Sequence, residues 1–315
     1  QGSRGEGGWL MVEEVKAAKV YGGLEVETVL DPRAQPFLYD HQMDGTPILP
    51  GVMGTEAFAE VAAALAPGYR LAAVENEQFH LPFKFYRQQP DILYLNVWAE
   101  PTADGELVAH TTLRSLRLPA KPGLPVQEKL HFTADVRLTR AGVEPTSTGE
   151  ASGEKAILAP ESGRPLASPL PAAEAMPITA EEIYRIYFHG PAYQVLERVQ
   201  VEGERAIGLM AADLPPDTAP AEANLLMAPR LIELCFQTAG IWQIKTKGVM
   251  ALPMALQSVT TYRQLEEADG RRLYAVVQAI NGGASFDAQV VDETGAIYVT
   301  LTGYRTIALE GSVTL

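Results

Sequence analysis

The chain has 315 residues and a formal net charge of −14, and 47% of its residues are hydrophobic. The acidic balance argues against non-specific nucleic-acid binding, which requires clustered Lys and Arg to replace phosphate counterions, and it gives no support for binding to an anionic membrane. The single cysteine, Cys235, cannot form an internal disulfide. The sequence shows no signal-peptide pattern and no run of about 18 apolar residues. We therefore expect a cytoplasmic globular protein that binds neither nucleic acid nor membrane.

The first half of the chain predicts one long helix among antiparallel strands. Residues 1–8 are rich in Gly and Ser, resemble a linker, and are left out of the fold prediction. An Ala-rich helix pattern runs over 52–66 and stops at Pro67-Gly68, and its small residues on nearly every face indicate that other structure wraps it closely. Apolar patterns bounded by turn residues predict strands at 24–29, 71–79, 92–99, 107–118 and 128–138.

The second half repeats this plan after a segment of different character. Residues 141–178 are rich in Pro, Gly, Ala, Ser and Thr without apolar periodicity, which predicts a linker or long surface loop. A helix is predicted at 229–242, and strands are predicted at 196–201, 205–210, 257–262, 272–280, 285–291 and 296–308. The order of elements indicates an α+β fold with an N-terminal subdomain at 9–140, a linker at 141–178 and a C-terminal subdomain at 179–315.

The most informative stretch is the segment from His41 to Pro50, in which Gly45 follows His41 by four positions and Pro50 follows Gly45 by five. A loop shaped by Gly and Pro that feeds a helix N-terminus directs backbone N–H groups at a ligand. A base beside such donors can remove a proton next to a carbonyl while the donors hold the developing oxyanion. The segment is therefore a candidate active-site loop, although a histidine in a loop is more often structural or solvated.

This segment resembles the HxxxGxxxxP motif of the dehydratase domains of polyketide synthases and animal-type fatty-acid synthases. Three other segments are similar to motifs of the same family and lie at compatible separations. The stretch 189–194 (HGPAYQ) resembles YGPxFQ, Leu81-Pro82-Phe83 resembles LPF, and the stretch from Glu233 to Gln237 resembles DxxxQ/H. Each motif is weak alone, but together they cover most of residues 24–310.

The resemblance implies a double hot-dog fold, in which two tandem units each wrap a curved antiparallel sheet around a long helix. It places the active site in a tunnel between the units, with His41 as base and Glu233 as acid. Burial in an apolar tunnel raises a carboxyl pKa, as an acid at Glu233 requires. The supporting residues are expected to be Gln237, Gly45, Pro50, Tyr187 and His189, with the Gly45 N–H at the thioester carbonyl. The tunnel lining is expected to include Gly51, Pro82, Phe83, Pro191 and Tyr193.

The activity implied is elimination of water from a 3-hydroxyacyl thioester to give an enoyl thioester. The substrate is expected on the phosphopantetheine arm of an acyl carrier protein, with no cofactor or metal bound by the domain itself. The acyl carrier protein and neighbouring synthase domains are the expected partners, and a homodimer is expected by resemblance to the family.

Two departures from the motifs leave alternatives open. Glu233 replaces Asp and is one methylene longer, and His189 replaces the Tyr that precedes Gly-Pro. A misplacement of about 1 Å can cost roughly 10²-fold in rate. The alternatives are a cyclase or isomerase of the same fold, and a non-catalytic docking module in which Glu233 marks lost chemistry. A hot-dog thioesterase is disfavoured by the loop from His41 to Pro50.

Overall fold

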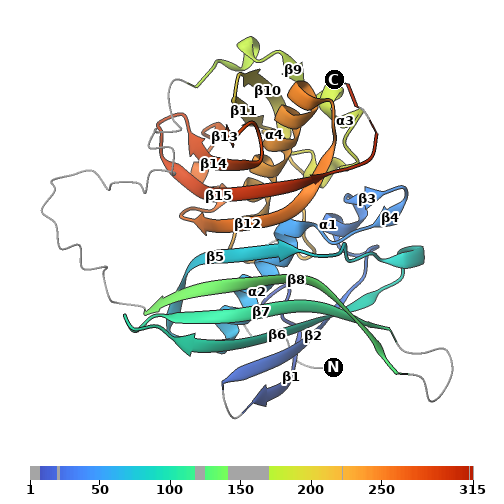
Figure 1. Cartoon of the computed structure of the whole chain (residues 1–315), viewed down its shortest axis with the longest axis vertical. Coiled ribbons are helices and arrows are strands. Elements are labelled where there is room, and N and C mark those ends of the chain that lie inside the picture. Colours follow the sequence, from blue (N-terminus) through green and yellow to red (C-terminus); the bar gives the residue numbers. More distant parts are fainter. Residues whose placement is uncertain are drawn as a thin grey trace, which may run out of the picture.

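A computed structural model describes residues 8–19, 22–117, 125–140, 170–221, 223–311 and 313–314. One antiparallel sheet of 13 strands runs through both halves of the chain (Figure 1). Its strand order is β1-β2-β6-β7-β8-β5-β12-β15-β14-β13-β11-β10-β9. Strands of the first half therefore occupy one side of the sheet and strands of the second half occupy the other.

In the first half, six strands curve around helix α2 (Gly51–Leu65). Residues on all faces of this helix are buried, as the density of small residues predicts. The short helix α1 (Pro36–Tyr39) and the hairpin of β3 (Gln42–Met43) and β4 (Thr46–Pro47) precede α2. The six strands are β1 (Glu14–Lys19), β2 (Gly23–Leu30), β5 (Tyr69–Phe79), β6 (Asp91–Pro101), β7 (Leu107–Arg117) and β8 (Gln127–Arg140).

In the second half, helix α4 (Pro229–Lys247) takes the place of α2. It packs against β10, β11, β13, β14 and β15, while the one-turn helix α3 (Ala180–Tyr184) lies beside β9 and β10. The strands are β9 (Ile178–Thr179), β10 (Leu196–Glu202), β11 (Arg205–Met210), β12 (Ala251–Thr261), β13 (Leu273–Ile280), β14 (Ser285–Asp292) and β15 (Ile297–Ala308).

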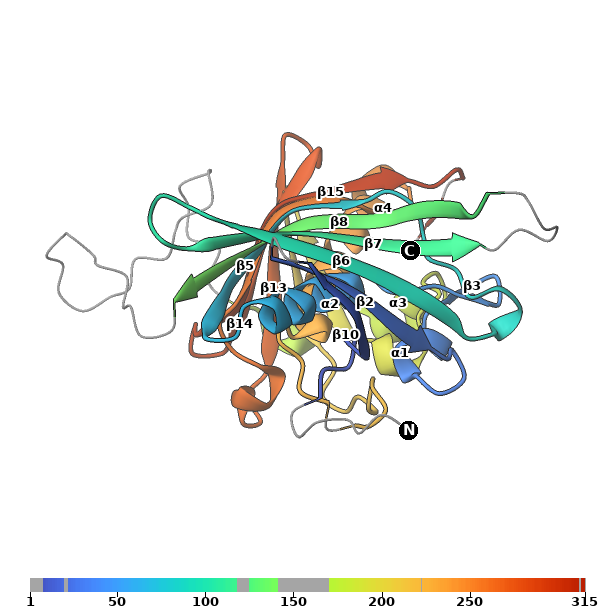
Figure 2. The same ribbon diagram turned by 90° about the horizontal axis from the view of Figure 1, so that it is seen from below.

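The two halves join where β5 pairs antiparallel with β12. The register runs from Gln78 opposite Ala255 to Val74 opposite Val259. Helices α2 and α4 contact each other on the concave side, so one apolar core extends through both halves (Figure 2). The site between the halves is therefore built on a continuous, closely packed frame.

One glycine in each half permits close approach of a helix and its sheet. A Cβ at Gly54 of α2 would lie 2.4 Å from the Phe132 ring of β8. A Cβ at Gly208 of β11 would lie 2.1 Å from the Thr238 hydroxyl of α4. A larger residue at either position would push the helix away from the strands that position the site.

The structure confirms both predicted long helices and the predicted strands of each half. Strand β12 begins at Ala251, six residues before its expected start, and Pro253 is tolerated because the pairing with β15 is irregular between Pro253 and Ala255. The sequence patterns missed β1, the two-residue strands and the short helices. Residues 141–169 of the expected linker lie outside the described residues, as does Leu118, and the end of that expected linker contains the first residue of β9.

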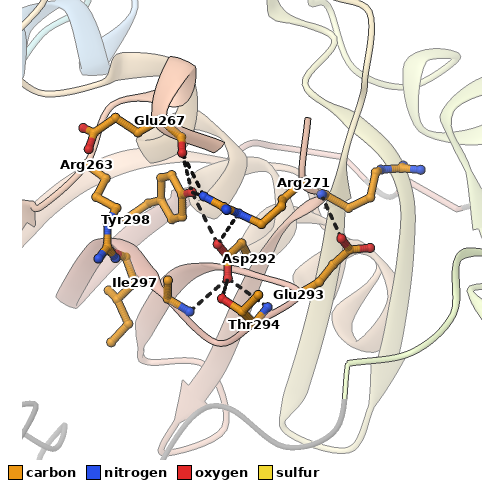
Figure 3. A network of polar contacts seen from close by, with 10 residues as sticks. Arg263, Glu267, Arg271, Asp292, Glu293, Thr294, Ile297 and Tyr298 are labelled. Atoms are coloured by element: carbon orange, nitrogen blue, oxygen red, sulfur yellow. Dashed lines mark hydrogen bonds and ion pairs between the residues drawn. The ribbon is translucent and has the colours of Figure 1, made fainter. Parts of the chain in front are cut away.

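The turn between β14 and β15 is organised by one buried carboxylate (Figure 3). The Oδ1 atom of Asp292 accepts hydrogen bonds from the Thr294 N–H, the Thr294 hydroxyl and the Ala296 N–H, at 2.9, 2.6 and 3.0 Å. Its Oδ2 atom lies 2.8 Å from Nε of Arg271 and 3.4 Å from the Tyr298 hydroxyl. These contacts satisfy both oxygens of a fully buried carboxylate and fix the hairpin that carries β15.

Three further carboxyl groups are buried around α2. Glu56 accepts backbone N–H groups of residues 226 and 227, and Glu60 accepts those of residues 10 and 11. Burial raises the pKa of Glu56 to about 7 and that of Glu60 to about 8. Glu77 of β5 accepts a hydrogen bond from the Thr55 hydroxyl at 2.8 Å, and burial raises the pKa of Glu77 to about 8.

Among the described residues, no helix is long and apolar enough to span a membrane.

The raised pKa of Glu77 predicts a specific pH dependence of stability. Folded protein keeps this proton up to about pH 8, whereas the unfolded chain loses it near the ordinary value of 4.5. The stabilisation that comes from protonated Glu77 is therefore complete below about pH 4.5 and is lost as pH rises towards 8. Between these pH values, its loss lowers the free energy of unfolding by up to about 1.4 kcal/mol per pH unit. Glu77→Gln should remove this slope in denaturant unfolding measured from pH 5 to 8, and curves parallel to wild type would contradict the assignment.

Candidate active site

His41 is held in one tautomer by the loop that precedes α2. Its Nδ1 atom lies 2.8 Å from the carbonyl oxygen of Ile48, and the Ile48 N–H donates to the His41 carbonyl at 2.9 Å. Because a carbonyl only accepts, Nδ1 carries the proton and Nε2 keeps its lone pair. Burial, together with the nearby charge of His189, lowers the pKa of His41 to about 4. The imidazole is therefore neutral near pH 7 and can act as a base.

Glu233 and Gln237 lie one turn apart on α4, and their side chains meet as the spacing predicts. Gln237 Nε2 donates to Glu233 Oε1 at 2.9 Å and to the Tyr193 carbonyl at 2.9 Å. His189 Nε2 lies 3.2 Å from the same Oε1 atom. Both polar contacts of the carboxyl group therefore fall on Oε1, and among the described residues Oε2 has no hydrogen-bond partner.

The amide of Gln237 is oriented by a fixed chain of donors. The Leu196 N–H donates to the Tyr184 hydroxyl at 2.8 Å, and that hydroxyl donates to Gln237 Oε1 at 2.9 Å. The Tyr187 hydroxyl donates to the Gln237 carbonyl at 3.0 Å. Since Oε1 accepts from Tyr184, Nε2 is the atom that faces Glu233. Gln237 thus orients the Glu233 carboxyl group.

The expected direction of the Glu233 pKa is wrong. Burial by itself raises the pKa of Glu233, but the contact with His189, the positive charge available on His189 and His41, and the Gln237 hydrogen bond outweigh it. The pKa therefore lies below its usual value. Burial of Glu233 can be expected from its place in an apolar helix, whereas the contact of His189 with the carboxylate arises only in the folded structure.

The two halves meet at the site through a backbone bridge between His41 and His189. Their ring centroids are 5.3 Å apart. Asp40 reinforces the bridge, because its carbonyl accepts the Gly190 N–H and its Oδ2 accepts the Ala192 N–H, at 2.6 and 2.8 Å. Asp40 thereby ties the first-half loop to the second-half loop.

A cavity of about 380 Å³ lies between the halves and contains His41, His189 and Glu233 in its wall. Most of the wall is apolar or aromatic, and Phe236 and Tyr304 stack there with centroids 4.2 Å apart. The other apolar wall residues include Phe79, Phe132, Met250, Leu252, Pro253 and Leu309. Such a wall suits a hydrocarbon chain whose one reactive region meets a few polar groups.

Several residues expected to support or line the site do lie in the cavity wall, namely Gly51, Pro82, Tyr187, His189 and Gln237. Pro50 lies outside the wall and is the N-cap of α2. Within the residues that the structure describes, no cluster of His, Cys, Asp or Glu side chains could hold a metal ion.

Gly45 does not take the place expected for it. It is exposed, has a φ of +72°, and forms the turn between β3 and β4 rather than part of the cavity wall. Its role is to make the turn, for which a positive φ favours glycine. Gly51, by contrast, lines the cavity and opens α2, so its N–H has no intrahelical acceptor.

Three expected tunnel residues lie outside the cavity wall. Phe83 is fully buried against Phe85. Pro191 is exposed at the start of a 3₁₀ turn. Tyr193 is fully buried and contributes its carbonyl to Gln237. Sequence position near a motif identified the neighbourhood, but side-chain direction in each turn decided which residues reach the cavity.

Sequence reasoning missed Asp40 as a link between loops, Tyr184 as the orienting donor and the aromatic wall. The wall residues come from β5, β8, α4 and β15, which are distant in sequence, so no local motif joins them. The available signal for Tyr184 was its position in the same short segment as Tyr187.

Comparisons with known proteins define the class of this structure. The chain has a TM-score of 0.69 and 18% identity to the dehydratase domain from the CurF module of curacin polyketide synthase, covering 96% of this chain and 98% of that one. A trans-AT polyketide synthase dehydratase domain from Brevibacillus brevis gives the same score and identity, with 95% and 98% covered. These likenesses establish the double hot-dog fold.

Two family models together cover most of the chain. The model described as polyketide synthase dehydratase domain matches residues 10–111, and the model described as polyketide synthase dehydratase N-terminal domain matches residues 164–314. The chain belongs to the polyketide synthase dehydratase family.

Two curated relatives are much longer than this chain. The chain is 24% identical over 245 residues to a polyunsaturated fatty acid synthase protein of Thraustochytrium sp., and 24% identical over 278 residues to polyketide synthase ThaG of Burkholderia thailandensis. The matches include 76% and 87% of this chain but span only 8% and 4% of the relatives. These relatives carry the region that matches this chain within much larger proteins.

The contact between Asp40 and Gly190 predicts the effect of one methyl group. A Cβ at Gly190 would lie 2.5 Å from Asp40 Oδ1 and 3.0 Å from its Cα, so Gly190→Ala must displace one of the two loops. We expect a folded protein whose catalytic activity falls by about 10-fold or more, because small misplacements of catalytic groups are costly.

Gly105→Ala is the matched control for this substitution. Gly105 has a positive φ, but a Cβ there meets nothing within 4 Å and the turn is not part of the cavity wall. The control should lose some thermal stability and keep its activity. Equal activity in the two variants would contradict the proposed role of the bridge.

Proposed function

We propose that this domain eliminates water from a 3-hydroxyacyl thioester, with His41 as base and Glu233 at the leaving hydroxyl. The observation that carries the proposal is the meeting of a neutral imidazole and a carboxyl group from opposite halves in one apolar cavity. His41 Nε2 takes the α-proton, the Cα–Cβ double bond forms, and the Cβ–O bond breaks. The hydroxyl then leaves as water, with a proton delivered through the carboxyl group.

The Gly51 N–H is proposed to face the thioester carbonyl. It opens helix α2 and lies in the cavity wall, so a backbone donor at the positive end of a helix is available where negative charge develops. The free Oε2 atom of Glu233 is proposed to face the β-hydroxyl, because Oε1 already holds Gln237 and His189. In this proposal the base, the carbonyl donor and the acid share one cavity.

We further propose that the substrate reaches the cavity on the phosphopantetheine arm of an acyl carrier protein, and that the domain binds no cofactor of its own. The size of the curated relatives supports neighbouring synthase domains as partners, and a homodimer remains a prediction of the family resemblance. The proposed division into 9–140, 141–178 and 179–315 is supported by the sheet, in which the first-half strands and second-half strands are not interleaved.

The direct test is turnover of a 3-hydroxyacyl pantetheine thioester, followed in both directions by mass spectrometry. His41→Ala and Glu233→Gln should each lower kcat by about 10² to 10⁴-fold, the range for loss of a general base or acid. His110→Gln is the matched control, because His110 pairs with Asp135 outside the cavity wall. Turnover that survives His41→Ala would overturn the mechanism.

The same assay separates the alternatives. Isomerised or cyclised product without release of water would indicate the isomerase or cyclase. Binding without turnover of any chain length would indicate a docking module. A gain of activity in Glu233→Asp would mean that Glu233 has weakened the site, whereas a loss would mean that the cavity is built for the longer side chain.

A further inference from the structure

The contact between His189 and Glu233 joins two of the positions at which the chain departs from the family motifs. His189 Nε2 lies 3.2 Å from Glu233 Oε1, and the side chains are only 8% and 7% exposed. The histidine stacks on Phe188 with a centroid distance of 4.5 Å and an interplanar angle of 18°. A tyrosine at this position could donate a hydrogen bond but could not carry a positive charge near pH 7, so the histidine adds a chemical capacity.

Few of the other titratable groups that face the His189–Glu233 pair change charge near neutral pH. Burial raises the pKa of Tyr184, Tyr187, Tyr193, Tyr304 and Cys235, and each of these groups is influenced by Glu233. His41 is neutral above about pH 4. His80 and Lys84 also line the cavity. Within the buried part of the described site, the proton of the His189–Glu233 pair is therefore the one available to an acid.

We propose that His189 and Glu233 together hold the single proton that leaves with the substrate hydroxyl. This inference rests on the proposed dehydration. An ion pair with the proton on His189 and a neutral pair with the proton on Glu233 are two forms of one protonation state, so the proton belongs to the pair rather than to either residue. Glu233 can thus be ionised in the resting site and still deliver a proton. His189 acts through Glu233 and is a positioning residue for that proton.

The number of protons on His41, His189 and Glu233 is the same before and after one turnover. The Cβ–O electrons remain on oxygen, which takes the proton of the pair and leaves as water, while His41 gains the α-proton. The pair is left as an ionised Glu233 and a neutral His189. Transfer of the proton from His41 back to the pair restores the resting state, and the net products are enoyl thioester and water.

An unsatisfied atom explains why the histidine gives up this proton. His189 Nδ1 is buried and has no hydrogen-bond partner among the residues that the structure describes. A protonated ring carries N–H groups on both nitrogens, and a buried N–H without an acceptor is destabilising. The cation is therefore stabilised on one side only, by Glu233, and becomes less stable when the carboxyl group turns to the substrate.

The decisive experiment is histidine-selective ¹⁵N NMR of the whole domain, which has five histidines. Wild-type His189, assigned with His189→Gln, should show a protonated ring at pH 7, and the same ring should be neutral in Glu233→Gln. His110→Gln serves as a control that removes one signal outside the cavity. A His189 ring that is neutral in both proteins, or protonated in both, would overturn the inference.

Activity against pH provides a second readout. His189→Gln keeps an amide donor for Glu233 but cannot hold the proton, so kcat at pH 7 to 8 should fall by about 10-fold or more. The loss should shrink at lower pH, where Glu233 itself is protonated. An unchanged pH profile in His189→Gln would overturn the inference and leave dehydration intact. Absence of turnover in wild type alongside a shared proton would instead overturn the proposed function, and with it the role of this proton.

Discussion

The constraint on which the site depends is the backbone bridge between His41 and His189. It joins the loop before α2 to the loop before β10, and Asp40 strengthens it by holding the Ala192 N–H. The proposed base and acid come from different halves, and the bridge fixes the two loops against each other next to both side chains. Because Gly190 has no side chain, Asp40 can approach the second-half loop closely enough to make these hydrogen bonds.

The frame around the bridge is made rigid by burial. Helices α2 and α4 are each enclosed by strands, and the pairing of β5 with β12 makes the two sheets one. Buried carboxyl groups also hold backbone segments in place by hydrogen bonds, as Glu56 does for residues 226 and 227, just before α4. The proposed catalytic pair is drawn from both halves and requires such a frame, because a displacement of about 1 Å is costly in rate.

The chemistry of the site is decided by the contacts of Glu233 rather than by its burial alone. Gln237 and His189 occupy Oε1 and leave Oε2 free, and they keep the carboxyl group ionised in a cavity that would otherwise favour its protonated form. His41 shows the opposite balance, because burial dominates and leaves it neutral. The two groups thus reach complementary states through different causes, and the pairing of Glu233 with a histidine supplies the proton that an isolated carboxylate would lack.

The sequence by itself determined the two long helices, most of the strands, and the catalytic candidates His41, Glu233 and Gln237, because these depend on local periodicity and on short motifs. Only the tertiary structure decided that Gly45 makes a turn, that Phe83 and Tyr193 lie outside the cavity wall, and that Asp40 links the loops. The direction of the Glu233 pKa was also beyond the sequence. It depends on the 3.2 Å contact with His189, 44 positions away along the chain, and this contact between α4 and the loop before β10 exists only after the second half has folded.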